Sequence, residues 1–161
     1  MQLDERDMAI LDRLQAKGRM ANADLAQEVG LSASACHRRV RSLEDAGIIS
    51  GYVALLSEEK LGRSSSVFVQ VTLDNQQREN LSRFEAAVSK CDEIMECFLM
   101  TGEADYLLRV CVRDTSDYER LHHDVLTRLP DVTRVVSNYA IRKVFRRTAL
   151  PLADTKGTEQ A

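Results

Sequence analysis

The sequence predicts an α+β protein with two domains, a helical N-terminal domain and a C-terminal domain of strands and helices. Over residues 1–47, apolar side chains recur every three or four positions, which is the period of amphipathic helices. From residue 66 onward, stretches of alternating apolar and polar residues are separated by two further helical stretches. The composition, with 44% hydrophobic and 29% charged residues, is typical of globular domains and excludes a fibre or a disordered chain.

Two short helices are predicted before residue 30. Asp4 is a suitable N-cap for the first helix, which extends to Gly18. Asn22 is expected to cap the second helix, which extends to Val29. The side chains expected to be buried are Leu3, Ile10, Leu11, Leu14, Leu25, Ala26 and Val29.

Residues 30–47 predict a third helix with one apolar and one basic side. Gly30 can adopt the left-handed conformation that ends the preceding helix, and Ser32 can cap the next one. With 3.6 residues per turn, one side carries Cys36, Val40 and Leu43. The opposite side carries Ser34, His37, Arg38 and Arg41. A basic helix side of this kind fits a DNA groove, and three helices in this order predict a helix-turn-helix domain.

The residues predicted to bind DNA are Ser32, Ser34, His37, Arg38, Arg39 and Arg41. A solvated charged face is the alternative, but the helix contains no acidic residue before Glu44. Arg39 lies beside the apolar stripe, so it suits a phosphate contact or an ion pair better than a base edge. For His37, groove contact and simple solvent exposure are both consistent with the sequence.

Residues 48–56 are too rich in β-forming side chains, and too few, to form another helix. Ser50 and Gly51 provide a turn, so the segment is predicted to be a small wing. Residues 1–56 would then form a three-helix winged helix-turn-helix DNA-binding domain. The polar stretch 57–65 is predicted to be a linker.

Residues 66–150 predict a second domain in the order strand, helix, strand, strand, helix, strand. The strands at 94–101 and 106–113 meet at Gly102, and a capping box at Ser116 begins a helix that ends at Pro130. Residues 67–73 form the first strand and residues 132–145 supply the last strand or two. This is a ferredoxin-like βαββαβ sandwich with both helices on one face of an antiparallel sheet.

The second domain is expected to dimerise, because several strands are apolar on both sides and two helices cover only one face. We expect the sheets of two chains to pack together. The polar residues 151–161 are expected to form a flexible tail.

The charge and the cysteine content limit the kinds of function that the sequence allows. The net charge is −3, and residues 1–56 carry seven basic against eight acidic residues, so DNA binding must depend on where the charges lie. The four cysteines lack zinc-site spacing, so buried hydrophobic roles in a reducing compartment are favoured over metal or redox roles. No apolar run approaches the ~20 residues that span a bilayer, and a cytoplasmic protein without a membrane partner is expected.

The chain resembles the leucine-responsive and asparagine-operon regulators, the Lrp/AsnC family, over nearly its whole length. The resemblance rests on LDERDMAILDRLQAKGR, NADLAQEVGLSASACHRRVRSLEDAGIISGYVALL, MECFLMTGEADYLLRV and LHHDVLTRLPDVTRVVSNYAI, in this order. It implies a prokaryotic, nucleoid-associated transcription regulator with a C-terminal domain of the RAM type. That domain would form dimers, assemble them into octamers or similar rings, and bind a small-molecule effector, usually an amino acid. No cofactor, metal or catalytic residue is expected.

The resemblance also implies an effector pocket between neighbouring dimers. By motif position, the effector-binding residues are Leu99, Met100, Thr101, Gly102, Glu103, Asp105, Thr115, Asn138, Tyr139 and Ala140. Asp105 or Glu103 could accept hydrogen bonds from the ammonium of an amino acid, and amides around Gly102 could donate to its carboxylate. Many relatives have an aromatic residue where this chain has Ala104, so the identity of the effector does not carry over.

The predicted function is a sequence-specific DNA-binding regulator, not an enzyme, whose assembly and DNA binding respond to a small molecule. Two recognition helices of a dimer would read an imperfect palindrome with half-sites about 34 Å apart. An architectural protein that wraps nucleoid DNA without a ligand is the alternative. A hydrolase is a weaker alternative, because His122 and His123 point in different directions and no nucleophile motif accompanies them.

Overall fold

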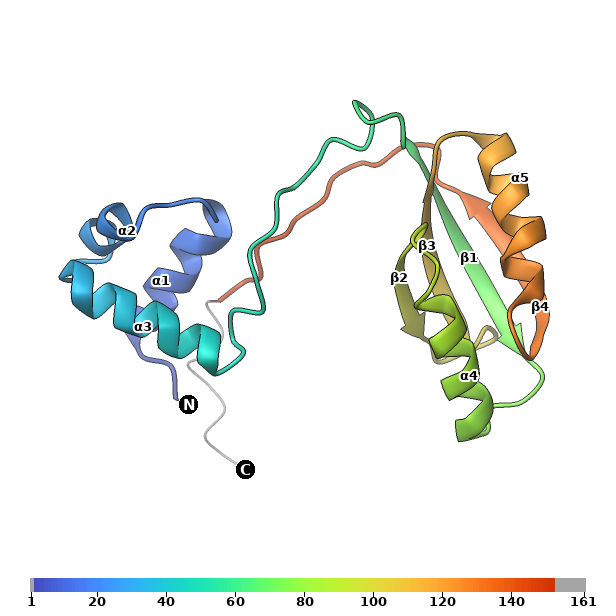
Figure 1. Ribbon diagram of the computed structural model, residues 1–161, viewed down its shortest axis with the longest axis horizontal. Coiled ribbons are helices and arrows are strands. Elements are labelled where there is room, and N and C mark those ends of the chain that lie inside the picture. The colour runs from blue at the N-terminus through green and yellow to red at the C-terminus, as the bar shows by residue number, and fades with distance from the viewer. Residues whose placement is uncertain (1, 153–161) are drawn as a thin grey trace. The chain divides into compact units, whose positions relative to one another are not determined.

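The computed structural model describes residues 2–152, which form two compact units (Figure 1). One unit holds residues 2–55 together with residues 145–152, and the other holds residues 56–144. Most of the predicted tail, residues 151–161, lies outside the described range. None of the helices in the described range combines the length and the apolar character that a membrane span requires.

Three α-helices form the first unit. They are α1 (Glu5–Ala16), α2 (Asn22–Glu28) and α3 (Ala33–Asp45). Asp4 caps α1 as predicted, because its carboxylate accepts hydrogen bonds from the amides of Arg6 and Asp7. Ser32 caps α3 by accepting a hydrogen bond from the Ala35 amide, so this prediction is also confirmed.

The start of α2 differs from the prediction. Ala21 occupies the N-cap position, and Asn22 is the first helical residue. The side-chain amide of Asn22 instead donates to the carbonyl of Ala33 at 2.8 Å, which ties the start of α2 to the start of α3. Gly30 has a φ of 66°, the left-handed conformation predicted for the end of α2.

The three helices share one small hydrophobic core. Its buried side chains are Ile10, Leu11, Leu25, Ala26, Val29, Cys36 and Leu43. Leu3, Leu14 and Val40 are only partly buried and pack against this core. The helical periodicity in the sequence therefore identified the buried side of each helix.

Residues 48–56 do not form the strands expected of a wing. The amides of Ile48 and Ile49 bond to the Leu43 carbonyl, and the chain then continues without regular structure. Val53 in this segment is 84% exposed. A β-forming composition produces a strand only where a neighbouring strand supplies hydrogen bonds, and this segment pairs with no strand in the described chain.

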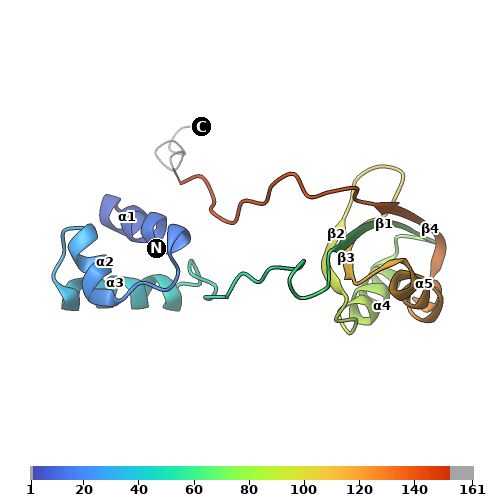
Figure 2. The same ribbon diagram turned by 90° about the horizontal axis from the view of Figure 1, so that it is seen from above.

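The second unit is a four-stranded antiparallel sheet in the order β2-β3-β1-β4, with two helices on one face (Figure 2). Its elements are β1 (Ser65–Leu73), α4 (Arg78–Val88), β2 (Ile94–Leu99), β3 (Tyr106–Val112), α5 (Thr115–Asp124), the 3-10 helix η1 (Leu126–Arg128) and β4 (Val132–Tyr139). This is the predicted ferredoxin-like βαββαβ order, and the α+β fold class is confirmed.

Three local predictions in the second unit are wrong. The helix expected to end at Pro130 ends at Asp124 and is followed by η1. Asp114 caps α5 in place of Ser116, because its carboxylate accepts a hydrogen bond from the Asp117 amide at 2.8 Å. The last strand ends at Tyr139, and no strand is assigned over residues 140–152. The apolar residues of that segment suggested a longer strand, but in the described chain no other strand lies beside them.

The two faces of the sheet have different surroundings. Val67, Val69 and Val71 of β1 face the helices and are completely buried. On the opposite face, Phe68 and Phe98 are 37% and 48% exposed. Exposed aromatic side chains on an open sheet face are typical of a surface that binds another protein surface.

Candidate functional site

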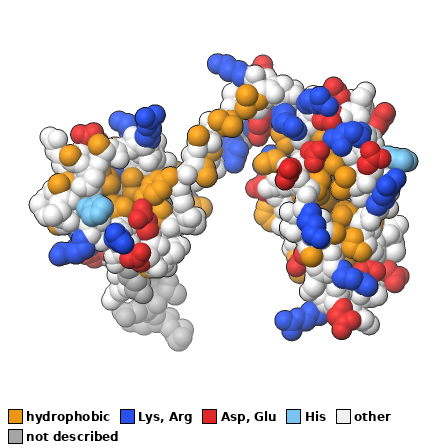
Figure 3. Space-filling view, in the orientation of Figure 1, with side chains coloured by type: hydrophobic (Ala, Val, Ile, Leu, Met, Phe, Trp, Pro, Cys, Tyr) orange, Lys and Arg blue, Asp and Glu red, His pale blue; other side chains and the backbone are white. Residues whose placement is uncertain are grey.

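The side of α3 that faces away from the helical core, called its outward side, is exposed to solvent, and the opposite side packs into that core. Cys36 and Leu43 are completely buried. The exposed residues on the other side are Ser34, His37, Arg38 and Arg41. Figure 3 shows basic side chains near a histidine on the visible face of the first unit. The structure therefore places four of the predicted DNA-binding residues on one exposed helix side.

Arg39 is held by acidic residues at the start of α1. Its guanidinium lies 2.7 Å from Oδ1 of Asp7 and 2.8 Å from Oδ2 of Asp4. Hydrogen bonds to Asp7 and Asp4 raise the pKa of Arg39. These ion pairs join α3 to the start of α1, and the partner carboxylate of Asp7 is buried. Of the two interpretations left open by the sequence, the structure favours the ion pair.

Two contacts that the sequence did not reveal fix the turn before α3. Arg6 donates to the Val29 carbonyl at the end of α2, and Asn22 donates to the Ala33 carbonyl. A Cβ atom at Gly30 would lie 3.2 Å from the Arg6 guanidinium, so the turn is closely packed as well as left-handed. These contacts hold the N-terminal end of α3, including its Ser32 cap, in one position.

A hollow of about 430 Å³ borders the outward side of α3. Its lining includes Leu14, His37, Arg41, Glu44 and Tyr52. The Tyr52 hydroxyl donates to Glu44 at 3.0 Å, and burial together with this carboxylate raises the pKa of Tyr52 to about 12. Tyr52 thus ties the chain that follows α3 to the end of that helix. The sequence predicted Tyr52 as part of a wing and did not indicate this contact.

The turn between β2 and β3 is open to solvent. Leu99 and Met100 are 59% and 42% exposed, and Thr101 and Glu103 are also exposed. Gly102 has a φ of 127°, which side chains rarely allow, and a Cβ atom there would meet nothing within 4 Å. This turn can therefore approach a ligand or another chain closely.

Asp105 differs from its neighbours in the turn, because it is buried. Its carboxylate accepts a hydrogen bond from the Leu73 amide at 2.6 Å and from the Gln76 side chain at 2.5 Å. The Asp105 amide donates to the Val71 carbonyl. Asp105 therefore fastens the turn to the end of β1.

The remaining predicted effector residues lie at the other end of the sheet. Tyr139 pairs with Val67 of β1, whereas Tyr106, which follows the open turn, pairs with Val71. Four residues of strand separate these rows by about 13 Å. The residues at the far end are Thr115, Asn138, Tyr139 and Ala140. A single chain therefore does not bring the two groups of predicted effector residues together.

Tyr139 is held by the helix that covers this end of the sheet. Its ring packs edge-on against Tyr118 of α5, with 5.2 Å between the ring centroids. The Tyr118 hydroxyl bonds to Ser137, and the Ala140 amide donates to the Ser66 carbonyl. The end of β4 is thus fixed, although the Tyr139 side chain is 46% exposed.

The cysteines are dispersed. Cys36 and Cys111 are buried as expected, and burial raises the pKa of the Cys36 thiol. Cys97 in β2 is exposed, contrary to the expectation of a buried role. Within residues 2–152, no group of three or more His, Cys, Asp or Glu side chains is placed to hold a metal ion.

Both units match models of known families. Residues 66–150 match the Lrp/AsnC ligand binding domain, and residues 3–50 match a winged helix-turn-helix DNA-binding domain. The chain belongs to the Lrp/AsnC family. The resemblance noted in the sequence is confirmed, and the chain is a DNA-binding transcriptional regulator with a ligand-binding domain, not an enzyme.

Relatives of this Lrp/AsnC chain match both units. The Bkd operon transcriptional regulator of Pseudomonas aeruginosa is 44% identical over 151 residues, covering 94% of this chain and 99% of that protein. The leucine-responsive regulatory protein of Escherichia coli K12 is 45% identical over 130 residues, covering 81% and 79%. A Neisseria meningitidis transcriptional regulator, solved in complex with L-Met, has a TM-score of 0.89 at 36% identity, covering 94% and 98%.

Proposed function

We propose that this regulator reads imperfect palindromic operators in double-stranded DNA through the outward side of α3. The observation that carries the proposal is that one side of α3 packs into the core through Cys36 and Leu43 while the other exposes Ser34, His37, Arg38 and Arg41. Arginine side chains can bond guanine edges in the major groove, and serine or histidine can bond bases or phosphates. Ser32 at the N-cap suits a phosphate contact, and Arg39 positions α3 through Asp7.

The regulator acts as a homodimer that assembles further into an octamer or a similar ring. The open sheet face with Phe68 and Phe98 supports packing of two chains, because their burial removes apolar surface from water. Two basic residues lie on this face, Arg109 and the exposed Arg134 of β4, which pairs with Thr72 of β1. Arg109 already pairs with Glu96 and Glu58, so its charge does not oppose burial. A dimer presents two copies of α3 to half-sites about 34 Å apart.

The effector is an amino acid bound between subunits. The separation of the two groups of predicted residues supports this, because a neighbouring chain can supply the second group. Glu103 is the acceptor for the ammonium, since Asp105 already accepts two hydrogen bonds within its own chain. Amides near Gly102 bind the carboxylate, and Leu99 and Met100 contact the side chain. The neighbouring subunit contributes Thr115, Asn138, Tyr139 and Ala140. The L-Met complex of the Neisseria meningitidis protein is consistent with this chemistry.

Effector binding shifts the population of assemblies and so changes how many DNA sites are bound together. A coupling free energy of about 1–3 kcal/mol is enough to change occupancy by roughly five- to 150-fold. The protein needs no cofactor for this function. It acts in the cytoplasm, in association with the nucleoid.

Footprinting and titration calorimetry test this function. Footprinting should show a discrete protected site with two half-sites related by two-fold symmetry on a regulated promoter. Calorimetry should show heat of binding with at least one member of a panel of amino acids. Extended periodic protection without sequence preference would instead indicate an architectural DNA-wrapping protein. Absence of heat with every amino acid, together with unchanged sedimentation, would contradict the effector proposal and leave DNA binding intact.

A further inference from the structure

A basic segment follows the last strand. Residues 140–152 contain Arg142, Lys143, Arg146 and Arg147 and no acidic residue. All four basic residues are exposed, and no strand or helix is assigned over this segment. Lys143 pairs with Glu58. Among the described residues, Arg146 and Arg147 make no ion pair, so their charges are available to a partner.

The end of this segment is part of the DNA-binding unit, which includes residues 145–152. The side-chain amide of Gln15 in α1 donates to the Leu150 carbonyl at 3.2 Å and accepts from the Leu150 amide at 2.6 Å. Using both backbone groups of one residue, Gln15 holds the segment as a neighbouring strand would. Leu152 then packs against the core of the three helices.

The anchor lies near the DNA-binding side of α3. Leu14, which precedes Gln15, lines the same hollow as His37 and Arg41. Arg147 is three residues from Leu150, so its Cα lies within about 11 Å of the anchored residue. Arg146 is one residue further along, so its Cα lies within about 14 Å of Leu150, which is bound to the C-terminal end of α1.

Residues 2–55 have a net charge of −1, and residues 2–55 together with residues 145–152 have a net charge of +1. Residues 2–55 carry seven basic and eight acidic residues, and two of the basic ones, Arg13 and Arg39, pair with acids. Arg146 and Arg147 raise the basic count to nine. Phosphate binding depends on such local positive charge, because each neutralised phosphate releases condensed counterions.

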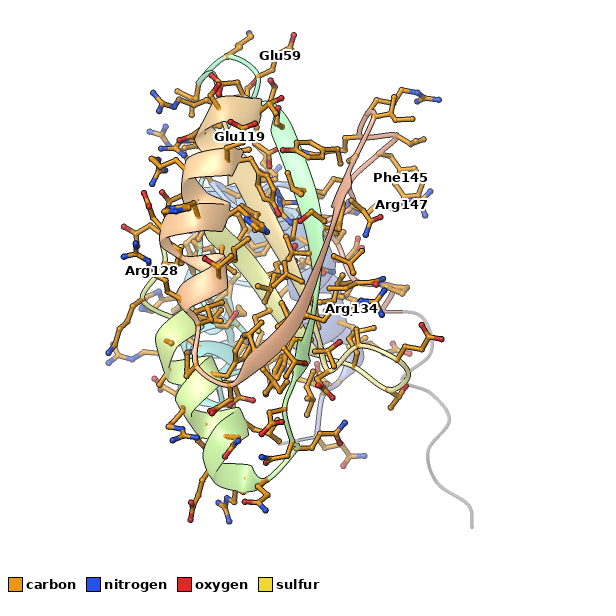
Figure 4. The ribbon with its side chains drawn as sticks, turned by 90° about the vertical axis from the view of Figure 1, so that its right-hand side faces the viewer. Glu59, Glu119, Arg128, Arg134, Phe145 and Arg147 are labelled. Carbon is orange, nitrogen blue, oxygen red and sulfur yellow. The ribbon has the colours of Figure 1, made fainter. Side chains whose placement is uncertain are left out.

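Arg147 is oriented by its neighbour. Its guanidinium lies over the ring of Phe145, 5.2 Å from the centroid, and Figure 4 shows both side chains on the C-terminal segment. The Phe145 side chain is 72% exposed, so this cation-π contact holds Arg147 at the surface rather than in a core.

We propose that Arg146 and Arg147 form a second DNA contact, which binds the phosphate backbone beside the groove that α3 enters. Phosphates carry no sequence information, so this contact strengthens binding to every duplex about equally. Gln15 is a positioning residue for it. The inference rests on DNA binding by α3, and its test separates the two.

The test measures the affinity of full-length protein for duplex DNA by fluorescence anisotropy over a range of salt concentrations. The Arg146→Ala, Arg147→Ala double variant should reduce the slope of log K against log salt by about 1.8, which corresponds to two phosphate contacts. Replacing both with lysine should keep the wild-type slope. Arg78→Ala with Arg128→Ala is the matched control, because both residues are exposed, make no ion pair within residues 2–152, and belong to the other unit.

A further variant tests the anchor. Gln15→Leu should lower the slope towards that of the double variant, because the segment is released from α1. A double variant with the wild-type slope and an unchanged melting temperature overturns the inference. An equal reduction of the slope in the Arg78 and Arg128 control also overturns it. Arg38→Ala with Arg41→Ala should abolish preference for the operator. If that loss occurs while the Arg146 and Arg147 variant binds as wild type does, the proposed second contact is refuted and DNA binding by α3 is supported.

Discussion

Asp105 and Glu103 lie two residues apart in the turn between β2 and β3, yet the structure predicts different effects when each is replaced. Asp105→Ala removes the acceptor of the Leu73 amide, which is buried. An unsatisfied buried donor costs about 1–3 kcal/mol. A loss of about 2 kcal/mol lowers the melting temperature of a domain of 60–100 residues by about 8–16 °C. Asp105→Asn keeps one acceptor oxygen and should lose about half as much.

Glu103→Ala should leave the melting temperature nearly unchanged, because an exposed side chain without structural contacts contributes within about 0.5 kcal/mol. It should instead remove the heat of effector binding. The assay combines differential scanning calorimetry with titration of the amino acid that binds wild-type protein, and Glu79→Ala in α4 serves as an exposed control. The reasoning is refuted if Asp105→Ala melts like wild type, or if Glu103→Ala binds the effector with full affinity.

The remaining predictions concern pH. The pKa of Tyr52 is raised from 10.0 to about 12 by burial and by Glu44, so the stability it contributes is present below pH 10 and is lost as pH rises towards 12. Denaturation midpoints should fall over this range in wild type and fall less in Tyr52→Phe. The pKa of Asp117 is lowered from 3.8, mainly by Arg113, so its contribution is present above this pH and is lost in stronger acid. Asp117→Asn should be less stable at neutral pH and show a smaller acid-induced loss, whereas Asp12→Asn, at an exposed position, should match wild type.

The helical unit was largely predictable because its determinants are local. Apolar spacing identified the buried side of α3, and Ser32 and Asp4 cap helices through residues two or three positions away. Arg39 could not be assigned from the sequence, because its partner Asp7 lies 32 residues away. Asn22 was misplaced for the same reason, since its side chain bonds to Ala33 rather than to its own helix.

The β-structure was predictable in order but not at its ends. The alternation in residues 67–73 matches β1, where every second side chain is buried. Residues 48–56 and 140–145 have a similar composition but no neighbouring strand in the described chain, so they remain irregular. Strand formation depends on hydrogen bonding to a neighbouring strand, and the amino-acid composition of a segment does not show whether such a strand is present.

The residues predicted to bind the effector lie in two separate groups, and the sequence did not reveal this separation. Only the strand order shows that Gly102 and Tyr139 lie at opposite ends of the sheet. The same register shows that Asp105 supports the end of β1 and leaves Glu103 exposed. Only the three-dimensional structure shows which of these residues lie near one another and which are buried.

Binding of the purified protein to duplex DNA, with and without the arginines of α3, tests the central claim most directly. Anisotropy should show tight binding of wild type to an operator found by footprinting. Arg38→Ala and Arg41→Ala should each weaken it by about 1–3 kcal/mol, with smaller losses on an unrelated duplex. Equal affinity of both variants and wild type for the operator, or no binding of wild type to duplex DNA at low salt, would contradict the assignment of α3 as the recognition helix.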